Sequence, residues 1–284
     1  MEVNPKRSKL SARRGNSESE TKQGSDDEED DLDFTQREPV EVATQSMSQV
    51  YDDDDNEPTS IANMNSKTKE DLLAKTVRYL LYKASAFEPV KLPELRKAVF
   101  PGHQNVTRYF LGHAARKLET IFGYKAVAVD DFVGGGSGKK DVFLIVNSIA
   151  DQSHLIKVNK FHGKKERGLL MMIFGFIWCA PARRLEEDKL WKNLTLLDKS
   201  IRDKKHPVFG DLTLLLKAFE SQTYLTSDSE IDPDGKRVKF YMFGPRAMAE
   251  VGKAQILTFV CKLINGRHPS KELLAELEHE DSQE

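Results

Sequence analysis

Residues 106–146 read VTRYFLGHAARKLETIFGYKAVAVDDFVGGGSGKKDVFLIV, and this stretch decides the fold. Apolar residues recur at helical spacing as far as Phe122, and Gly123 is a natural C-terminal stop for such a helix. Two strand-like runs follow, 124–129 and 142–146, and the glycine-rich segment between them is typical of a flexible hairpin tip. The stretch therefore predicts a helix that leads directly into a two-stranded hairpin.

Two further helices are predicted before this stretch. The first begins near residue 67, carries Leu73, Val77, Leu80 and Ala84 on one face, and ends at Pro89. The second spans 92–99 with Pro93 in its first turn, and Pro101-Gly102 breaks it. Three short helices and then a hairpin form the element order of a winged helix, which we expect over residues 67–150.

The same element order is predicted a second time. Residues 168–179 are apolar on nearly every side, which indicates a central buried helix. Helices near 186–197 and 211–220 follow, then a hairpin from 223–226 and 238–243 around Asp232-Pro233-Asp234-Gly235, and a closing helix from Pro245 to Gly266. This second winged helix is expected over 151–271. The fold class predicted is α+β, mainly α, with tandem winged-helix domains.

Charge is strongly segregated along the chain. The net charge is −2, but residues 1–66 hold 7 basic and 17 acidic residues, so the remainder is basic. Residues 1–66, with their runs of aspartate and glutamate, are predicted to be a disordered acidic arm, and 272–284 an acidic tail. The basic cluster at 5–14 matches a nuclear import signal. A basic domain suits contact with nucleic acid, although solvated surface charge gives the same composition.

Several classes of chemistry find no support in the sequence. The seven histidines are scattered, no Gly-x-Ser-x-Gly or His-Glu-x-x-His pattern occurs, and Cys179 and Cys261 lack metal-ligand spacing. The 134–140 stretch lacks the first glycine and the Ser/Thr of a phosphate-binding loop, and it precedes a strand. We expect no catalytic residue, no metal and no cofactor. No signal peptide is visible and no apolar run is long enough to span a membrane, so a soluble intracellular protein is expected.

Four landmarks, in order, resemble the MAGE homology domain family over about 67–271. They are Arg78–Lys83 with Glu88-Pro89-Val90, then Leu118–Gly123, the apolar helix Gly168–Ile177, and Phe240–Ala247, in which a strand runs into Gly-Pro-Arg-Ala. The resemblance implies a tandem winged-helix adaptor. One branch of the family is the third non-SMC subunit of the structural-maintenance-of-chromosomes complex of the five-six type, with a RING-type ubiquitin-ligase subunit, a kleisin subunit and SMC ATPases as partners.

That branch implies double-stranded DNA binding without sequence specificity, DNA repair and recombination, and a nuclear, chromosome-associated location. The other branch implies an adaptor that stimulates a RING ubiquitin ligase and recruits substrates, with no DNA role. A free-standing transcription factor is a third alternative. The acidic arm and basic domain favour the first branch.

Two sets of apolar residues are the candidate contacts with protein partners. The resemblance implies that Leu80-Leu81 contact the RING partner. Neighbouring residues on a helix point about 100° apart, so one leucine can face the surface, whereas the simpler interpretation makes both core residues. In the second module, the resemblance implies a kleisin-binding groove. Its walls are expected from the apolar helix, at Met171, Met172, Phe174 and Phe176, although core packing explains the same residues.

The DNA hypothesis depends on basic clusters in the second module. In winged helices the third helix approaches the major groove while the wing touches the backbone. The candidates are Arg183 and Arg184 after the central helix; Lys199, Arg202, Lys204 and Lys205 before the third helix; Lys217 on it; and Lys236, Arg237 and Lys239 in the wing. Such residues would bind phosphates. Scattered solubility charge is the alternative, as it is for Lys139-Lys140 in the first wing.

Overall fold

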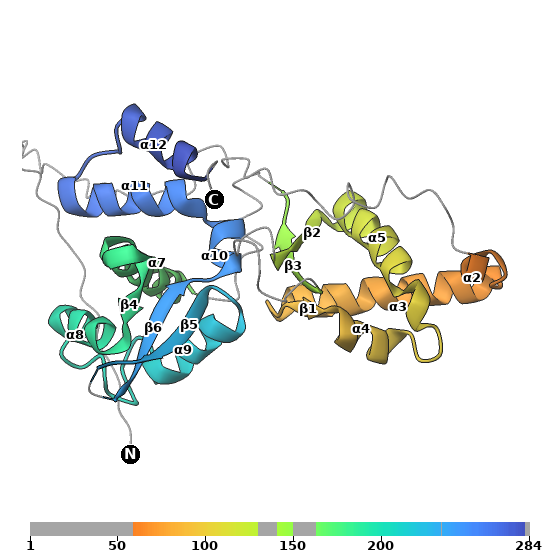
Figure 1. The fold of residues 1–284 in the computed structure, drawn as a ribbon, viewed down its shortest axis with the longest axis horizontal. Helices are drawn as coiled ribbons and strands as arrows, with labels where there is room; N and C mark the ends of the chain where they lie inside the picture. Colours follow the sequence, from red (N-terminus) through yellow and green to blue (C-terminus); the bar gives the residue numbers. More distant parts are fainter. Residues whose placement is uncertain (1–58, 130–140, 150–162, 234, 282–284) are drawn as a thin grey trace, which may run out of the picture. The chain divides into compact units, whose positions relative to one another are not determined.

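The computed structural model describes residues 59–129, 141–149, 163–233 and 235–281 (Figure 1). Two modules follow one another along the chain. The first contains α2 (Thr59–Ala62), α3 (Ser66–Ser85), β1 (Val90–Lys91), α4 (Leu92–Val99), α5 (Thr107–Lys117), β2 (Tyr124–Ala128) and β3 (Val142–Asn147). The second contains α7 (Lys164–Cys179), β4 (Leu185–Glu186), α8 (Glu187–Leu197), α9 (Leu212–Ser221), β5 (Leu225–Ile231) and β6 (Arg237–Phe243), and α10 (Pro245–Glu250), α11 (Gly252–Asn265) and α12 (Lys271–Asp281) close it.

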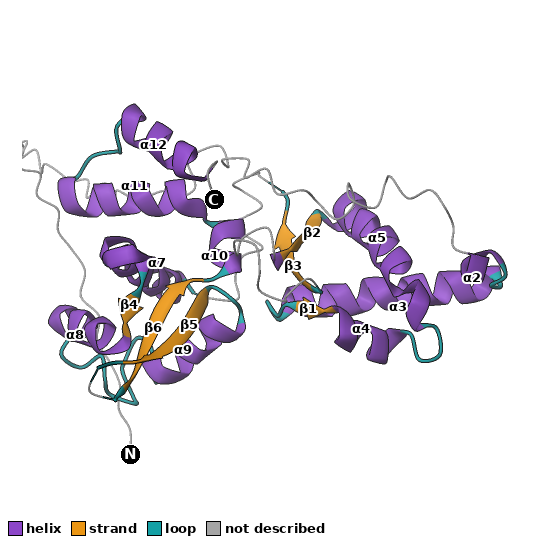
Figure 2. Ribbon diagram, in the orientation of Figure 1, coloured by secondary structure: helices purple, strands orange, loops and turns teal. Residues whose placement is uncertain are grey.

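The two modules share one sheet topology (Figure 2). In the first, the antiparallel order is β1-β3-β2, with Val90 opposite Phe143 and Val127 opposite Leu144. In the second it is β4-β6-β5, with Leu185 opposite Tyr241. The short strand β1 leads directly into helix α4, and the short strand β4 leads directly into helix α8. The predicted tandem winged-helix fold is confirmed, and the two short strands are an addition that two-residue segments could not reveal in the sequence.

Each module has its own apolar core. In the first, α3 buries Leu72, Thr76, Leu80 and Ala84, a stripe centred one residue away from the predicted Leu73 and Val77, which pack against its edge. In the second, α7 buries six residues at helical and adjacent positions, as its uniformly apolar sequence predicted: Leu169, Leu170, Ile173, Phe174, Gly175 and Ile177. Phe219 of α9 and Tyr241 of β6 pack in the same core.

Several boundaries differ from the sequence prediction. Helix α7 begins at Lys164 and not at 168, and strand β5 extends to Ile231 and not to 226. Helix α2 lies inside the segment assigned to the acidic arm, because Ile61 is fully buried in the first core. Helix α12 lies mostly in the segment assigned to the acidic tail, and it buries Leu277. The closing helix is divided into α10 and α11 at Gly252, whose φ of +78° is left-handed.

The Gly-Pro-Arg-Ala motif at 244–247 has a distinct physical role at each position. A Cβ on Gly244 would overlap the backbone carbonyl of Thr223, so only glycine permits this close approach. Pro245 occupies the first turn of α10, where a missing N–H costs nothing. The backbone N–H of Arg246 donates to the Thr223 carbonyl at 3.0 Å, and Ala247 is fully buried. The motif thus joins the second wing to the closing helices.

Candidate partner and nucleic-acid interfaces

The two leucines of the predicted RING contact lie in different environments. Leu80 is fully buried in the first core, so it is not available to a partner. Leu81 is half-buried and packs on the outside of that core, and the next residue, Tyr82, is 66% exposed. Leu80 and Leu81 point in different directions from α3, as helical geometry predicted. Leu81 and Tyr82 are therefore the residues of this segment that reach the surface.

The groove predicted from α7 is formed mainly by other residues. Phe174 is fully buried in the second core, whereas Met171 and Phe176 pack against that core and remain partly exposed. Only Met172 of the predicted set lines a groove. The sequence prediction placed the groove along the middle of α7, whereas the open apolar surface lies at its N-terminal half.

This apolar groove has a volume of about 410 Å³ and is bounded by α7, the C-terminal end of α8 and the loop that follows. Its lining residues are Lys165, Gly168, Leu169, Met172, Leu194, Leu197, Asp198, Ile201, Val208 and Phe209. Leu197 is 62% exposed and Val208 39% exposed, so apolar side chains of this groove are accessible to solvent. The sequence signal that could have located the groove was apolar Val208-Phe209 within an otherwise polar loop.

Several of the candidate DNA-binding cations are engaged by acidic or aromatic side chains. Arg184 donates to Glu230 at 2.6 Å and to Asp228 at 3.4 Å, both on β5. Lys236 pairs with Asp188 at 3.5 Å, and Arg183 stacks on Trp178 at 4.1 Å. These contacts neutralise or shield positive charge that was assigned to DNA.

Lys239 is the most firmly held of these cations. It pairs with Glu220 at 2.9 Å and donates to the Tyr241 hydroxyl at 3.0 Å. Burial alone would lower the pKa of Lys239, but the hydrogen bonds to Tyr241 and Glu220 raise it overall. In the second wing, Lys239 is thus held within the module, whereas Lys236 and Arg237 are both exposed.

The exposed cations gather in the loop between α8 and α9, residues 198–211, which we call the basic loop. Lys199, Lys204 and Lys205 are exposed and make no ion pair within the described part of the chain. Arg202 is exposed, with its guanidinium 5.4 Å from the Trp191 ring centroid. On the exposed face of the third helix, α9, Lys217 stands beside Thr213 and Leu214. The loop before α9 therefore carries four of the exposed candidate cations, and α9 adds Lys217.

A buried histidine hydrogen-bonds to both the start and the end of the basic loop. His206 is 5% exposed; its Nδ1 accepts hydrogen bonds from the backbone N–H groups of Val208 and Phe209, both at 3.2 Å, so its Nε2 carries the proton and donates to Asp198 at 2.9 Å. Asp198 also accepts from the backbone N–H and the hydroxyl of Ser200. The hydrogen bonds from Ser200 and His206 lower the pKa of Asp198 to about 2.

A second buried polar cluster surrounds Arg246, which is 1% exposed. Its guanidinium pairs with Glu250 at 2.7 Å and donates to three backbone carbonyls, those of Gln222, Ile145 and Phe87. The carbonyls of Ile145 and Phe87 belong to the first module, so one side chain bonds to both modules. The Tyr224 hydroxyl donates to Glu250 at 2.6 Å, and burial, reinforced by Glu250, raises the pKa of Tyr224. Arg246 was noted in the sequence only as part of a motif.

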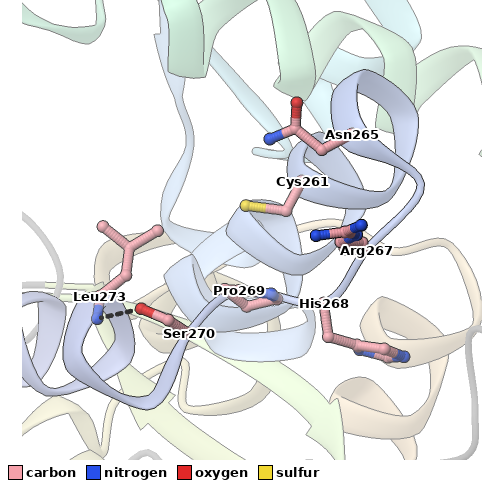
Figure 3. Close-up of a pocket in the computed structure, with 7 residues that line it drawn as sticks. All are labelled: Cys261, Asn265, Arg267, His268, Pro269, Ser270 and Leu273. Carbon is pink, nitrogen blue, oxygen red and sulfur yellow. Dashed lines mark hydrogen bonds between the residues drawn. The ribbon is translucent and has the colours of Figure 1, made fainter.

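A further hollow of about 460 Å³ lies between the end of α11 and the start of α12 (Figure 3). Its lining mixes a thiol, an amide, a cation, an imidazole and apolar side chains: Cys261, Asn265, Arg267, His268, Pro269, Ser270 and Leu273. The Ser270 hydroxyl accepts from the backbone N–H of Leu273 and so caps α12. This lining indicates no single ligand chemistry.

Two other features of the described residues bear on function. Across 59–129, 141–149, 163–233 and 235–281, no group of three or more His, Cys, Asp or Glu side chains is arranged to hold a metal ion. In the same ranges no helix is both long and apolar enough to cross a bilayer. The basic cluster at 5–14 and the Lys139-Lys140 pair lie outside the described residues.

Comparison with known proteins gives a consistent family match. The model of the MAGE homology domain matches residues 76–254. The human Non-structural maintenance of chromosomes element 3 homolog is 26% identical over 207 residues, which cover 72% of this chain and 65% of that protein. The chain therefore spans slightly less than two thirds of this relative. Human Melanoma-associated antigen B10 is 30% identical over 198 residues, covering 69% of this chain and 53% of that protein.

A solved structure gives an independent likeness at the level of the fold. A chain of the Nse1-Nse3-Nse4 complex superposes with a TM-score of 0.60 at 21% identity, covering 78% of this chain and all of the other. At this identity the likeness concerns the fold, and the repeated winged helix accounts for it.

Proposed function

The chain belongs to the MAGE homology domain family, and on this premise we propose that it is a non-catalytic scaffold subunit of a chromosome complex of the SMC five-six type. It joins a RING-type ubiquitin-ligase subunit to a kleisin subunit, reaches the SMC ATPases through that complex and holds double-stranded DNA. This places it on nuclear chromosomes, in repair and recombination. The names of the human Non-structural maintenance of chromosomes element 3 homolog and of the matching complex support this branch of the family.

The observation that carries the proposal is the apolar groove of the second module. Helix α7, the end of α8 and the basic loop form an open channel lined by aliphatic, methionine and phenylalanine side chains. Such a channel suits the apolar face of an amphipathic helix, whose anchors recur every three or four residues. Lys165 at the rim and the cations of the basic loop favour a helix with acidic flanks, which we assign to the kleisin subunit.

The RING-type subunit is assigned to the first module. Leu81 and the exposed ring of Tyr82 form an apolar surface on α3 on the outside of the first core. Exposed aromatic residues of this kind are frequent anchors of protein interfaces. Because Leu80 is buried, Leu81 and Tyr82 replace the leucine pair as the proposed contact.

Duplex DNA is assigned to the basic loop, and the salt dependence of binding tests this. Replacing Lys204 and Lys205 with glutamine is expected to reduce the slope of log K against log salt by about 1.8, since each phosphate contact contributes about 0.9. The measurement is fluorescence anisotropy with a duplex of mixed sequence between about 50 and 200 mM salt, the range over which such contacts are readily resolved.

The matched control replaces Lys236 and Lys239 with glutamine, which removes the same two charges. Lys236 is paired with Asp188 and Lys239 with Glu220, so this variant is expected to change the slope by less than one phosphate contact. A control that changes the slope as much as the loop variant would show that only net charge matters and would remove the assignment to the loop.

Co-purification tests the proposal as a whole. The full chain, tagged at its N-terminal end, is recovered from native nuclear extract and its stable partners are identified. A RING-type subunit together with a kleisin and two long coiled-coil ATPases is the expected result. A RING ligase alone would instead support an adaptor that recruits substrates and has no DNA role. The ion-paired state of Arg184, Lys236 and Lys239 is the observation that favours this alternative.

A further inference from the structure

The basic loop presents two different chemistries on one short segment. Ile201, Val208 and Phe209 line the apolar groove. Four exposed cations lie close to these residues in the sequence: Lys199, Arg202, Lys204 and Lys205. The proposed kleisin site and the proposed DNA site therefore share a structural element.

Hydrogen bonds connect these two parts of the loop through a single residue. His206 directly follows the Lys204-Lys205 pair, and its ring accepts from the backbone N–H groups of Val208 and Phe209 in the groove wall. Its backbone exchanges bonds with Gly210 at 2.9 and 3.2 Å, and its Nε2 donates to Asp198 at the start of the loop. The His206 ring also stacks on that of Phe209, 5.2 Å between centroids. His206 therefore connects the groove wall to the segment that carries the lysines.

We propose that this loop couples the two sites, so that a helix seated in the groove increases the affinity of the basic loop for duplex DNA. The inference rests on the proposed function and adds regulation to it. A helix packed on Val208 and Phe209 restricts the loop before DNA arrives, so DNA binding no longer bears the entropic cost of ordering the lysines. Coupling between two binding sites is reciprocal, so DNA strengthens helix binding by the same factor.

Gly168 allows the groove to be filled without any partner. It lines the groove within α7, and a Cβ built on it meets no atom within 4 Å. Gly168→Met is designed to add an uncharged side chain that is long and flexible enough to cover the groove. Gly168→Ala removes the same glycine from the helix but is too short to cover the groove. We expect Gly168→Met to bind a fluorescent duplex of mixed sequence about fivefold more tightly than Gly168→Ala, the lower end of ordinary coupling. Equal or weaker affinity would overturn the proposal.

His206 is assigned as the positioning residue of this coupling. In full-length His206→Ala, the two Gly168 variants are expected to bind DNA with equal affinity, because the groove wall and the lysines are no longer tied together. A merely structural role would weaken DNA binding by both Gly168 variants equally while keeping the fivefold ratio between them. Retention of that ratio without His206 would therefore contradict the assignment. Circular dichroism checks that all four proteins are folded.

The kleisin-type subunit recovered by co-purification provides the reciprocal test. Its affinity for the wild-type chain is measured with and without saturating duplex, and about a fivefold increase is expected. If both ligands bind the wild-type chain with unchanged affinities, the coupling is overturned and the proposed function stands. If the wild-type chain binds neither the subunit nor DNA, the proposed function fails, and the coupling fails with it.

Discussion

Replacing Arg246 with methionine is expected to lower the free energy of unfolding by about 3–5 kcal/mol, the usual effect of removing one partner of a buried ion pair. Arg246 is 1% exposed, and its loss leaves the Glu250 carboxylate without its cation. The carbonyls of Gln222, Ile145 and Phe87 lose their donor at the same time. Urea unfolding at neutral pH, followed by circular dichroism, measures the change.

Arg184 is a matched control for this experiment. It also contacts two partners, Asp228 and Glu230, but its side chain is 31% exposed and its acids are more than half exposed. Arg184→Met is expected to cost no more than about 1 kcal/mol, because exposed ion pairs contribute little. If Arg246→Met cost as little as Arg184→Met, the Arg246 cluster would not stabilise the contact between the modules.

Placing a carboxylate in the groove is expected to weaken binding of the partner helix. Leu197 lines the groove at the end of α8, and Leu197→Asp should weaken binding of the kleisin-type subunit about thirtyfold or more. This corresponds to the loss of about 2 kcal/mol typical of an interface hot spot. The charged group would have to be buried against an apolar helix without a partner of opposite sign. Isothermal titration calorimetry with the recovered subunit measures the affinity.

The adjacent residue provides the control. Leu196 is 77% exposed on the same turn of α8, yet it does not line the groove. Leu196→Asp introduces the same charge in the same helix and is expected to leave the affinity within about threefold of the wild type, the change produced by losing less than 1 kcal/mol. Equal weakening by the two variants would indicate a broad electrostatic effect and would place the partner helix outside the groove.

The predictions made from local pattern were the most successful. The helices around 92–99 and 186–197 and the hairpin strands near 124–129 and 142–146 were located to within a few residues. Each of these predictions depends on the spacing of apolar residues and on a proline or glycine that ends the element. Both are properties of residues close together in the sequence. Helix α12 was missed because its many acidic residues masked the single deep contact of Leu277.

The surroundings of the candidate site residues could not be predicted from the sequence, for one physical reason. Lys239 and Arg184 were grouped with the DNA cations because of their charge, but Glu220 and Glu230 pair with them across the second module. Phe174 was placed in a groove because it lies on the apolar helix from which the groove was expected, but its side chain is fully buried in the core. The charge or apolarity of a side chain can be read from the sequence. Whether that side chain already contacts another part of the protein depends on residues far along the chain.

The sequence by itself therefore determined the repeated winged-helix order, the acidic composition of residues 1–66 and the basic character of the remainder. Those properties follow from residues within a few positions of one another. Only the tertiary structure decided that the groove lies between α7, α8 and the basic loop, that His206 connects it to the exposed lysines, and that Arg246 bonds to both modules. Each of these depends on contacts between segments that only packing brings together, such as Arg246 and Phe87, which are 159 residues apart.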